Sequence, residues 1–197
     1  LADIDWIRSV LRSPTVVPGI TTVKRTYGRA EDARPRAEPL DLDLYIDSSG
    51  SIANPQVQLS FLALAGTIIA LSCLRSGGRV QATLWSGARE FETTNGFVTD
   101  VDRILRIVTG YLGGATAFPI HVLRETYGPR RPQDRPVHLL VISDDGVTTM
   151  FQTDETGKDG RTVAIDALAK ARGGGSMVLN LLGWPDDLDQ ATDMGWD

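Results

Sequence analysis

The sequence is poor in the residues that mark redox or histidine-based chemistry. It contains one cysteine, Cys73, and two histidines, His121 and His138, among 197 residues. A single cysteine excludes an internal disulfide, and we expect a buried free thiol because apolar residues surround Cys73. We expect His138, inside an apolar run, to be a satisfied core residue and His121 to lie on a surface helix. Serine-type nucleophilic catalysis therefore finds no support.

Excess positive charge and membrane-length apolar runs are also absent. The chain has 20 Lys and Arg against 25 Asp and Glu, a formal net charge of −5, so no nucleic-acid partner is predicted. The longest apolar stretch, residues 59–74, is too short and too polar for a membrane span, and we interpret it as a buried helix. Asp3 and Asp5 interrupt the first residues, so we expect no secretory signal and predict a cytoplasmic location.

The composition, with 42% hydrophobic and 23% charged residues, is typical of a soluble globular domain. Residues 1–39 are predicted to be an amino-terminal helix (3–12), an extended arm (21–27) and a charged, proline-containing linker (28–39). Residues 40–197 are predicted to form one domain. Two of its aspartates, Asp41 and Asp43, fit a central strand less well, and we expect them to pair with arginines of the arm.

The domain shows alternating strand and helix patterns. This order predicts an α/β fold with a doubly wound, mainly parallel central sheet of about six strands and helices on both faces. The near-continuous apolar run at 137–142 is typical of a central parallel strand. The expected strands are 40–46, 79–86, 90–94, 137–142 and 177–182, and the expected helices are 55–74, 99–111, 118–127 and 161–171.

The stretch around which the domain is organised is residues 40–52, LDLDLYIDSSGSI. Its apolar residues alternate with polar ones up to Asp47, which predicts a strand. Asp47, Ser49 and Ser51 then follow at i, i+2 and i+4. Ligands bind at the carboxyl ends of strands in α/β sheets, so this carboxylate and these hydroxyls indicate a site for a hard divalent cation. The alternative is a serine-rich turn that caps the next helix.

Two motifs downstream strengthen the cation hypothesis. Gly113-Gly114-Ala115-Thr116 follows a helical segment, and Ser143-Asp144-Asp145-Gly146 ends the apolar run at 137–142. DxSxS after a strand, then GGxT, then a strand ending in an aspartate–glycine turn resembles the metal-ion-dependent adhesion site of the von Willebrand factor type A (vWA) domain. The resemblance extends over about residues 40–182.

This resemblance implies a Rossmann-like vWA fold of the bacterial intracellular type and a site for Mg²⁺, with Mn²⁺ or Ca²⁺ as alternatives. One coordination position would stay open for a Glu or Asp of a partner protein. A MoxR-like AAA+ ATPase or a metal chelatase is the partner that the resemblance suggests. Asp144 is preferred to Asp145 as the last ligand, because strand register fixes side-chain direction more firmly than a loop glycine does. The implied metal ligands are Asp47, Ser49, Ser51, Thr116 and Asp144.

Three other kinds of function compete with an intracellular binding module: nucleotide binding, phosphate-ester hydrolysis and extracellular adhesion. Dinucleotide and P-loop folds lack their glycine motifs here. A haloacid-dehalogenase-like phosphatase would use two aspartates two residues apart, as Asp41 and Asp43 are, but more strand follows these two. An extracellular adhesion module is the third, and the lone cysteine disfavours it. We predict no enzymatic activity, because no general base or nucleophile is evident beside the site.

Apolar residues near the predicted site suggest a contact surface for the partner. We expect these residues to form a rim around the metal. The rim would comprise Ser48, Ile52, Ala115, Phe118, Val147, Met150 and Phe151. The alternative is that these loop residues fold back onto the domain and are buried.

Overall fold

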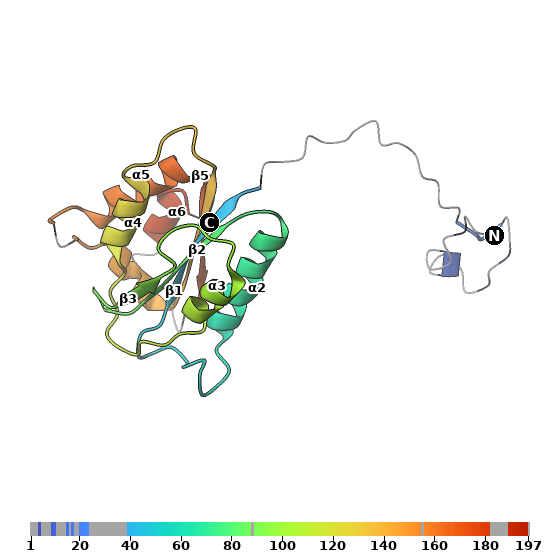
Figure 1. Cartoon of the computed structure of the whole chain (residues 1–197), viewed down its shortest axis with the longest axis horizontal. Helices are drawn as coiled ribbons and strands as arrows, with labels where there is room; N and C mark the ends of the chain where they lie inside the picture. Colours follow the sequence, from blue (N-terminus) through green and yellow to red (C-terminus); the bar gives the residue numbers. More distant parts are fainter. Residues whose placement is uncertain are drawn as a thin grey trace. The chain divides into compact units, whose positions relative to one another are not determined.

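The computed structural model (Figure 1) divides into two compact units, residues 1–38 and 39–197. It describes residues 4, 9, 10, 15, 17, 20–23, 39–87, 89–154, 156–181 and 189–196. In the first unit, Ser9 and Val10 are helical and the Val23 amide donates to Ser9 Oγ (2.8 Å). Most of the helix predicted at 3–12, most of the arm and nearly all of the linker fall outside the described residues.

The second unit contains a five-stranded sheet with the order β3-β2-β1-β4-β5. β1 (Asp41–Asp47) lies in the centre, parallel to β2 (Val80–Trp85) on one side and to β4 (Val137–Ser143) on the other. β5 (Arg172–Leu179) continues the parallel sheet, and the short β3 (Phe91–Thr93) is antiparallel to β2. The predicted central position of the first strand is confirmed, with five strands among the described residues where about six were expected.

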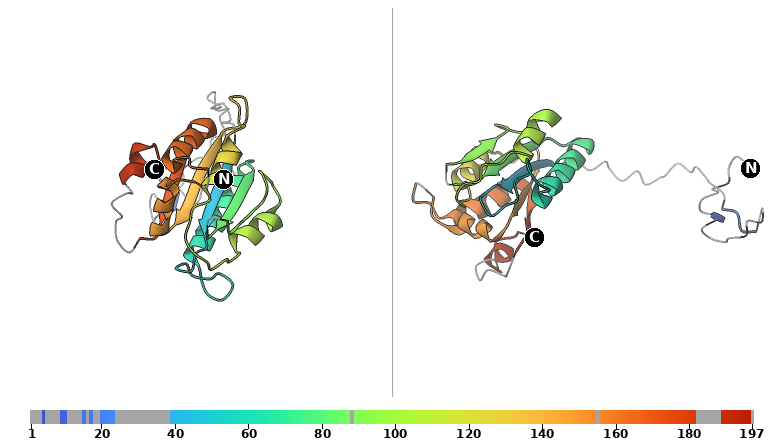
Figure 2. Two further views of the ribbon diagram at one scale, coloured as in Figure 1. Left: turned by 90° about the vertical axis from the view of Figure 1, so that its left-hand side faces the viewer. Right: turned by 90° about the horizontal axis from the view of Figure 1, so that it is seen from below.

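Helices cover both faces of this sheet (Figure 2). One core lies under α2 (Phe61–Arg75) and α3 (Val101–Val108), and the other lies under α4 (Ile120–Tyr127) and α5 (Gly160–Ala171). A 3₁₀ helix, η1 (Asp145–Phe151), follows β4, and a short α6 (Asp189–Asp193) comes near the end of the chain. The doubly wound α/β fold predicted from the alternation of patterns is therefore confirmed. None of the described helices combines the length and apolar character needed to cross a bilayer.

The period-two pattern of β1 places its residues in two different cores. Leu44 and Ile46 pack in the core under α2 and α3, whereas Tyr45 packs in the core under α4 and α5. Every residue of the strand is buried, as expected for a parallel strand that is covered on both faces. This burial fixes β1, and with it the loop that follows Asp47.

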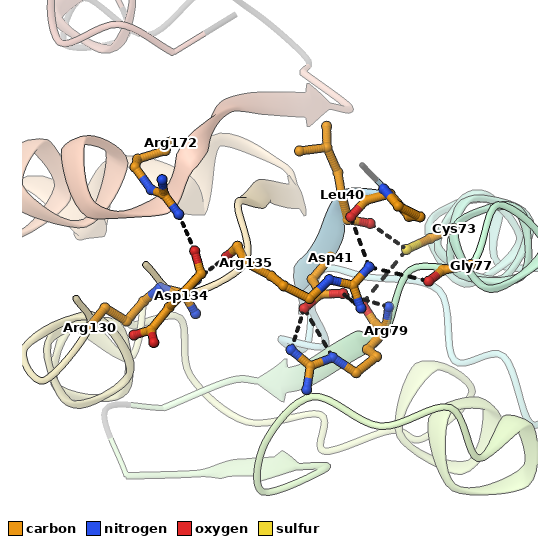
Figure 3. Close-up of polar contacts among 10 residues, drawn as sticks. Leu40, Asp41, Cys73, Gly77, Arg79, Arg130, Asp134, Arg135 and Arg172 are labelled. Carbon is orange, nitrogen blue, oxygen red and sulfur yellow. Dashed lines mark hydrogen bonds and ion pairs between the residues drawn. The ribbon is translucent and has the colours of Figure 1, made fainter. Parts of the chain in front are cut away.

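Asp41 is buried near the amino-terminal end of the sheet, beside two arginines of the same unit (Figure 3). Arg79 Nη2 lies 2.6 Å from Asp41 Oδ2, and Arg135 Nη1 lies 3.4 Å from Asp41 Oδ1. Arg79 also donates its backbone amide to Asp41 Oδ1 (2.9 Å). These contacts satisfy the carboxylate within the domain. The arm arginines that we expected beside it lie outside the described residues.

Asp43 is fully buried further along β1. Its carboxylate accepts hydrogen bonds from the Tyr127 hydroxyl (3.0 Å) and from Gln81 Nε2 (3.1 Å). Burial raises the pKa of Asp43 from 3.8 to about 7, although these hydrogen bonds and the charge of Arg130 oppose the shift.

The starts of two elements, α2 and β5, differ from the prediction by five residues or more. α2 begins at Phe61, not at residue 55, because the Ser60 hydroxyl caps it by accepting from the Ala63 amide (3.3 Å). β5 begins at Arg172, not at residue 177, because a glycine run brings the chain close against β4. A Cβ added at Gly173 would overlap the Val137 carbonyl group.

The cysteine and one histidine have defined surroundings. His138 is hydrogen-bonded through Nδ1 to the Gly173 carbonyl (2.8 Å) and through Nε2 to Ser176 Oγ (3.1 Å), which confirms a satisfied structural histidine. Cys73 is a free thiol, as expected, but it is half-buried, so the expectation of a buried side chain is wrong. Its Sγ donates to the Leu40 carbonyl over 3.5 Å (Figure 3).

Candidate metal site

Three loops meet at the carboxyl edge of the sheet, and they bring predicted ligands together. The loop after β1 turns back on its own strand, with the Ser49 amide donating to Asp47 Oδ1 (2.8 Å). Ser49 Oγ and Ser51 Oγ share a hydrogen bond of 3.1 Å, and the Ser51 hydroxyl donates to Asp144 Oδ2 (2.7 Å). Four of the five predicted ligands therefore form one continuous chain of hydrogen bonds.

Thr116, the fifth predicted ligand, lies close to the same side chains, as the space around Gly146 shows. A Cβ added at Gly146 would overlap Thr116 Cγ2 and would lie 3.0 Å from Asp144 Oδ1 and 3.5 Å from Asp47 Oδ2. These three side chains thus surround one point of the backbone. The structure brings all five predicted residues to one place.

The two neighbouring aspartates after β4 have different surroundings. Asp144 is half-buried, accepts from Ser51 through Oδ2 and accepts from the Gly146 amide through Oδ1 (2.9 Å). This second contact caps the start of η1. Asp145 is exposed and is the first residue of η1. The geometry places Asp144, the preferred candidate, among the other predicted ligands.

Asp47 lies at the base of the site and is almost completely buried, at 1% exposure. Burial raises its pKa, and the nearby charge of Asp144 raises it further. Hydrogen bonds from the Ser143 hydroxyl to Asp47 Oδ2 (2.5 Å) and from Ser49 lower the pKa and partly offset that effect. The buried carboxylate of Asp47 thus lies beside the half-buried carboxylate of Asp144, where a bound cation would neutralise charge that is poorly solvated.

Ser143 is a residue of this site that sequence reasoning missed. The signal was available in the sheet register, because Ile46 pairs with Ile142 and the next residues on the two strands are Asp47 and Ser143. Once β1 and β4 were expected to be neighbours, this alignment would have placed a hydroxyl beside the buried carboxylate.

Ser48, between two predicted ligands, holds the loops together. Its amide donates to the Trp85 carbonyl (2.8 Å), and its hydroxyl accepts from the Leu112 amide (2.8 Å). Its carbonyl accepts from the Gly113 amide (2.9 Å), and the Gly50 amide donates to the Gly114 carbonyl (3.0 Å). The serine loop and the GGxT loop therefore form one hydrogen-bonded unit.

The predicted rim around the metal is wrong for all but one of its members, because only Ala115 is exposed. Phe118 packs against Tyr45 and Trp85, with ring centroids 5.2 and 5.5 Å apart. The segment after Asp145 forms η1 and turns its apolar side chains into the core. The buried members of the predicted rim are Ser48, Ile52, Phe118, Val147, Met150 and Phe151.

The donor set fits a hard cation. Its side chains offer oxygen alone, from Asp47, Asp144 and three hydroxyl residues. Within the described ranges, no group of three or more His, Cys, Asp or Glu side chains is placed to hold a metal. Mg²⁺ takes only one or two carboxylates and fills its remaining positions with other oxygen atoms. The residues present therefore suit Mg²⁺, Mn²⁺ or Ca²⁺.

No family model and no curated protein sequence matches the chain. Among solved structures, it is similar to the SpRpn10 VWA domain, with 12% identity and a TM-score of 0.49, over 80% of this chain and 82% of that one. It is also similar to BatB from Bacteroides thetaiotaomicron, with 18% identity and a TM-score of 0.43, over 73% of this chain. A further similarity is to the N-terminal domains of the pilus tip protein Mfa5 from Porphyromonas gingivalis, with 14% identity and a TM-score of 0.42, over 54% of this chain.

The chain spans 66% of the BatB structure and 20% of the Mfa5 structure. Each of these TM-scores lies below 0.5. The order of the strands and the three converging loops of this chain itself therefore carry the functional interpretation.

Proposed function

We propose that the chain, a von Willebrand factor type A-like domain by its sheet order and converging loops, is a metal-dependent protein-binding module. The observation that carries this proposal is the hydrogen-bonded chain from Asp47 through Ser49 and Ser51 to Asp144. Together with Thr116, these residues would hold Mg²⁺, or Mn²⁺ or Ca²⁺ in its place. When bound, the cation supplies an electrophilic centre that attracts a carboxylate.

The proposed ligands differ in burial and would have different roles at this site. Asp47 and Ser49 are buried and would fix the base, whereas Ser51 is exposed and would face the partner. Hydroxyl donors leave more positive charge on the cation than additional carboxylates would. An incoming Glu or Asp of a partner therefore gains more here than at a fully neutralised site. We propose a MoxR-like AAA+ ATPase or a metal chelatase as this partner, in the cytoplasm.

The surroundings of the site support binding without catalysis. Neither histidine is a member of the hydrogen-bonded chain: His138 bonds to Gly173 and Ser176, and the His121 ring packs on Phe91 with centroids 5.1 Å apart. The phosphatase alternative would need Asp41 and Asp43 at an open site. Both are buried and satisfied by other side chains, so no observation favours that reaction.

Calorimetric titration of the full 197-residue chain with MnCl₂ tests the metal proposal. We expect one site with a dissociation constant of about 0.1 to 1 mM, in the range of weak calcium modules. Asp47→Ala should abolish binding, whereas Glu92→Ala, which removes an exposed carboxylate on β3, should leave it unchanged. Metal binding by Asp47→Ala equal to that of the wild type would refute the site.

The partner proposal needs a second measurement. A candidate AAA+ ATPase should be captured by the wild-type chain in MgCl₂, and EDTA or Thr116→Ala should abolish the capture. Circular dichroism should show that the Thr116→Ala chain remains folded. Capture that survives both treatments would leave ordinary surface recognition and would contradict a metal-mediated contact.

A further inference from the structure

Thr116 lies in a segment without regular secondary structure, between the end of α3 at Val108 and the start of α4 at Ile120. A side chain on such a segment is placed less precisely than one on a helix or strand. Its hydroxyl is also a neutral ligand, which gains little from attraction at a distance and must already lie close to the cation. The contribution of Thr116 to the proposed site therefore depends on what holds the residues on either side of it.

Ser86 holds both of these neighbours. The Ser86 hydroxyl donates to the Ala115 carbonyl (2.8 Å), and the Ala117 amide donates to the Ser86 carbonyl (2.7 Å). One hydrogen bond therefore precedes Thr116 in the chain and the other follows it. Together they fix the path of the backbone through Thr116.

Ser86 is itself held in place by the sheet. It directly follows Trp85, the last residue of β2, and it is completely buried. Its amide donates to the Glu90 carbonyl (2.9 Å), which ties it to the chain just before β3. Because β2 lies inside the sheet, between β3 and β1, Ser86 connects the loop of Thr116 to a fixed part of the domain.

The GGxT loop packs closely against this serine. A Cβ added at Gly114 would lie 2.9 Å from Ser86 Oγ and would overlap Glu90 Oε2. The absence of a side chain at Gly114 therefore lets the loop come close enough for the Ser86 hydroxyl to reach the Ala115 carbonyl.

The residue before Ser86 holds the other ligand loop. The Trp85 carbonyl accepts from the amide of Ser48, which lies between the proposed ligands Asp47 and Ser49 (2.8 Å). Two consecutive residues at the end of β2 thus bond to both loops. They set where the DxSxS loop and the GGxT loop lie relative to each other.

We propose that Ser86 is a positioning residue of the metal site, whose hydroxyl fixes the GGxT loop so that Thr116 can bind the cation. The inference rests on the proposed function. Ser86 lies outside the three sequence motifs of the site and would act through the Ala115 carbonyl without touching the cation. Residues that orient a metal ligand in this way commonly change metal affinity by about tenfold or more.

Ser86→Ala removes the hydroxyl but keeps the carbonyl that bonds to the Ala117 amide. We expect the Mn²⁺ affinity of the full chain to fall by about tenfold, measured by electron paramagnetic resonance of the free ion. Thr94→Val is the matched control, because Thr94 is equally buried and its hydroxyl donates to the Gly96 carbonyl (2.9 Å). It should lower the melting temperature to a similar extent and leave the affinity within about twofold of the wild type.

A double-mutant cycle with Thr116→Ala separates positioning from general damage. If Ser86 acts through Thr116, Ser86→Ala should change the affinity by less than about twofold once Thr116 is already alanine. Losses that multiply in the double variant would overturn the inference. Wild-type affinity in Ser86→Ala would also overturn it.

A measurement without metal gives the test a second readout. In the metal-free chain, amide hydrogen exchange at Ala117 should be about tenfold faster in Ser86→Ala than in Thr94→Val, because one of the two bonds beside Thr116 is lost. If Ser86→Ala does not fold, Gly114→Ala replaces it. Its methyl group would displace the Ser86 hydroxyl from the loop side and should cause the same losses.

The two readouts distinguish failure of this inference from failure of the proposed function. A wild-type chain that binds no Mn²⁺ would overturn the proposed function, and with it any role of Ser86 at a metal, even if exchange at Ala117 becomes faster. Normal wild-type binding together with unchanged affinity and exchange in Ser86→Ala would overturn the inference alone.

Discussion

The Ser51 hydroxyl donates a hydrogen bond of 2.7 Å to Asp144 Oδ2 and so joins two loops that are 93 residues apart in sequence. The neighbouring carboxylate of Asp145 is exposed at the start of η1. Two adjacent aspartates with the same chemistry thus occupy different positions relative to the candidate site. This difference gives a direct test of which carboxylate binds the cation.

Asp144→Asn should weaken Mn²⁺ binding by at least about tenfold, because it removes one of the few charges that attract the ion. Asp145→Asn makes the same chemical change one residue away and should leave the affinity within about twofold of the wild type. Calorimetric titration of both variants measures the difference. Equal losses would mean that long-range charge, and not coordination, governs the affinity, and a larger loss in Asp145→Asn would reverse the assignment.

Gly146→Ala should disturb the site while the domain stays folded. Its new methyl group would overlap Thr116 Cγ2 and press on Asp144 Oδ1, so Thr116 must move away. We expect a loss of about tenfold in Mn²⁺ affinity with a melting temperature near that of the wild type. Gly50→Ala is the matched control, since its Cβ would make ordinary contacts of 3.4 Å with the Gly113 and Gly114 carbonyls. Unchanged affinity in Gly146→Ala would show that Thr116 does not contribute.

The buried carboxyl of Asp43 predicts that stability depends on pH. Its pKa is about 7 in the folded protein and near 3.8 when exposed. Between these two values the folded state keeps a proton that the unfolded state has released. The stabilisation from protonated Asp43 is therefore complete below about pH 4 and is lost as the pH rises through about 7. The full effect corresponds to ~4 kcal/mol of unfolding free energy.

Urea unfolding between pH 4 and pH 8 measures this dependence. Asp43→Asn, which cannot ionise, should flatten the fall in stability, and the Tyr127 hydroxyl can still bond to the amide. Asp102→Asn removes an exposed carboxylate on α3 and should retain the wild-type slope. Burial also raises the pKa of Asp47, so a smaller slope of the same sign should persist in Asp43→Asn. An unchanged slope in Asp43→Asn would contradict the assignment.

The two arginines beside Asp41 should differ in their contributions to stability. Arg79 donates to the buried carboxylate through Nε (3.1 Å) and Nη2 (2.6 Å), whereas the nearest approach of Arg135 is 3.4 Å. Arg79→Met should therefore lower the unfolding free energy by ~2 kcal/mol because Asp41 loses its strongest partner. Arg135→Met should cost about half as much, since it loses a weaker ion pair and a bond to the Pro39 carbonyl (2.9 Å). Urea unfolding at pH 7 would show the order, and an equal cost for both would contradict it.

The sequence predicted the central strand and the three loops because their signals are local. Alternation in β1 and glycine-containing turns specify conformation within a few residues. The prediction of an exposed rim was wrong because the burial of its residues depends on η1. There the Thr149 hydroxyl donates to the Gly146 carbonyl and accepts from the Phe118 amide, which joins two loops. The start of β5 was predicted too late because glycines have low strand propensity. Pairing with β4 overrides that preference.

The exposed side of α2 also escaped sequence reasoning. An apolar stretch predicts a buried helix whether the covering surface comes from the same chain or from another protein. Phe61 and Ile68 look like core residues in the sequence, and only the positions of the surrounding elements show that they are exposed. The apolar pattern of a helix therefore indicates that another surface must cover it, but it does not identify the protein that supplies this surface.

The pairing of β1 with β4 has a consequence for biosynthesis. Asp47 and Ser143, which meet at the ends of these strands, are 96 residues apart, while β2 pairs with β1 after a much shorter interval. During translation, the strand that becomes the middle of the sheet must therefore wait with one long edge open until β4 emerges from the ribosome. Unpaired apolar edges favour aggregation, so β1 carries this hazard until β4 has been made and the loops of the candidate site can meet.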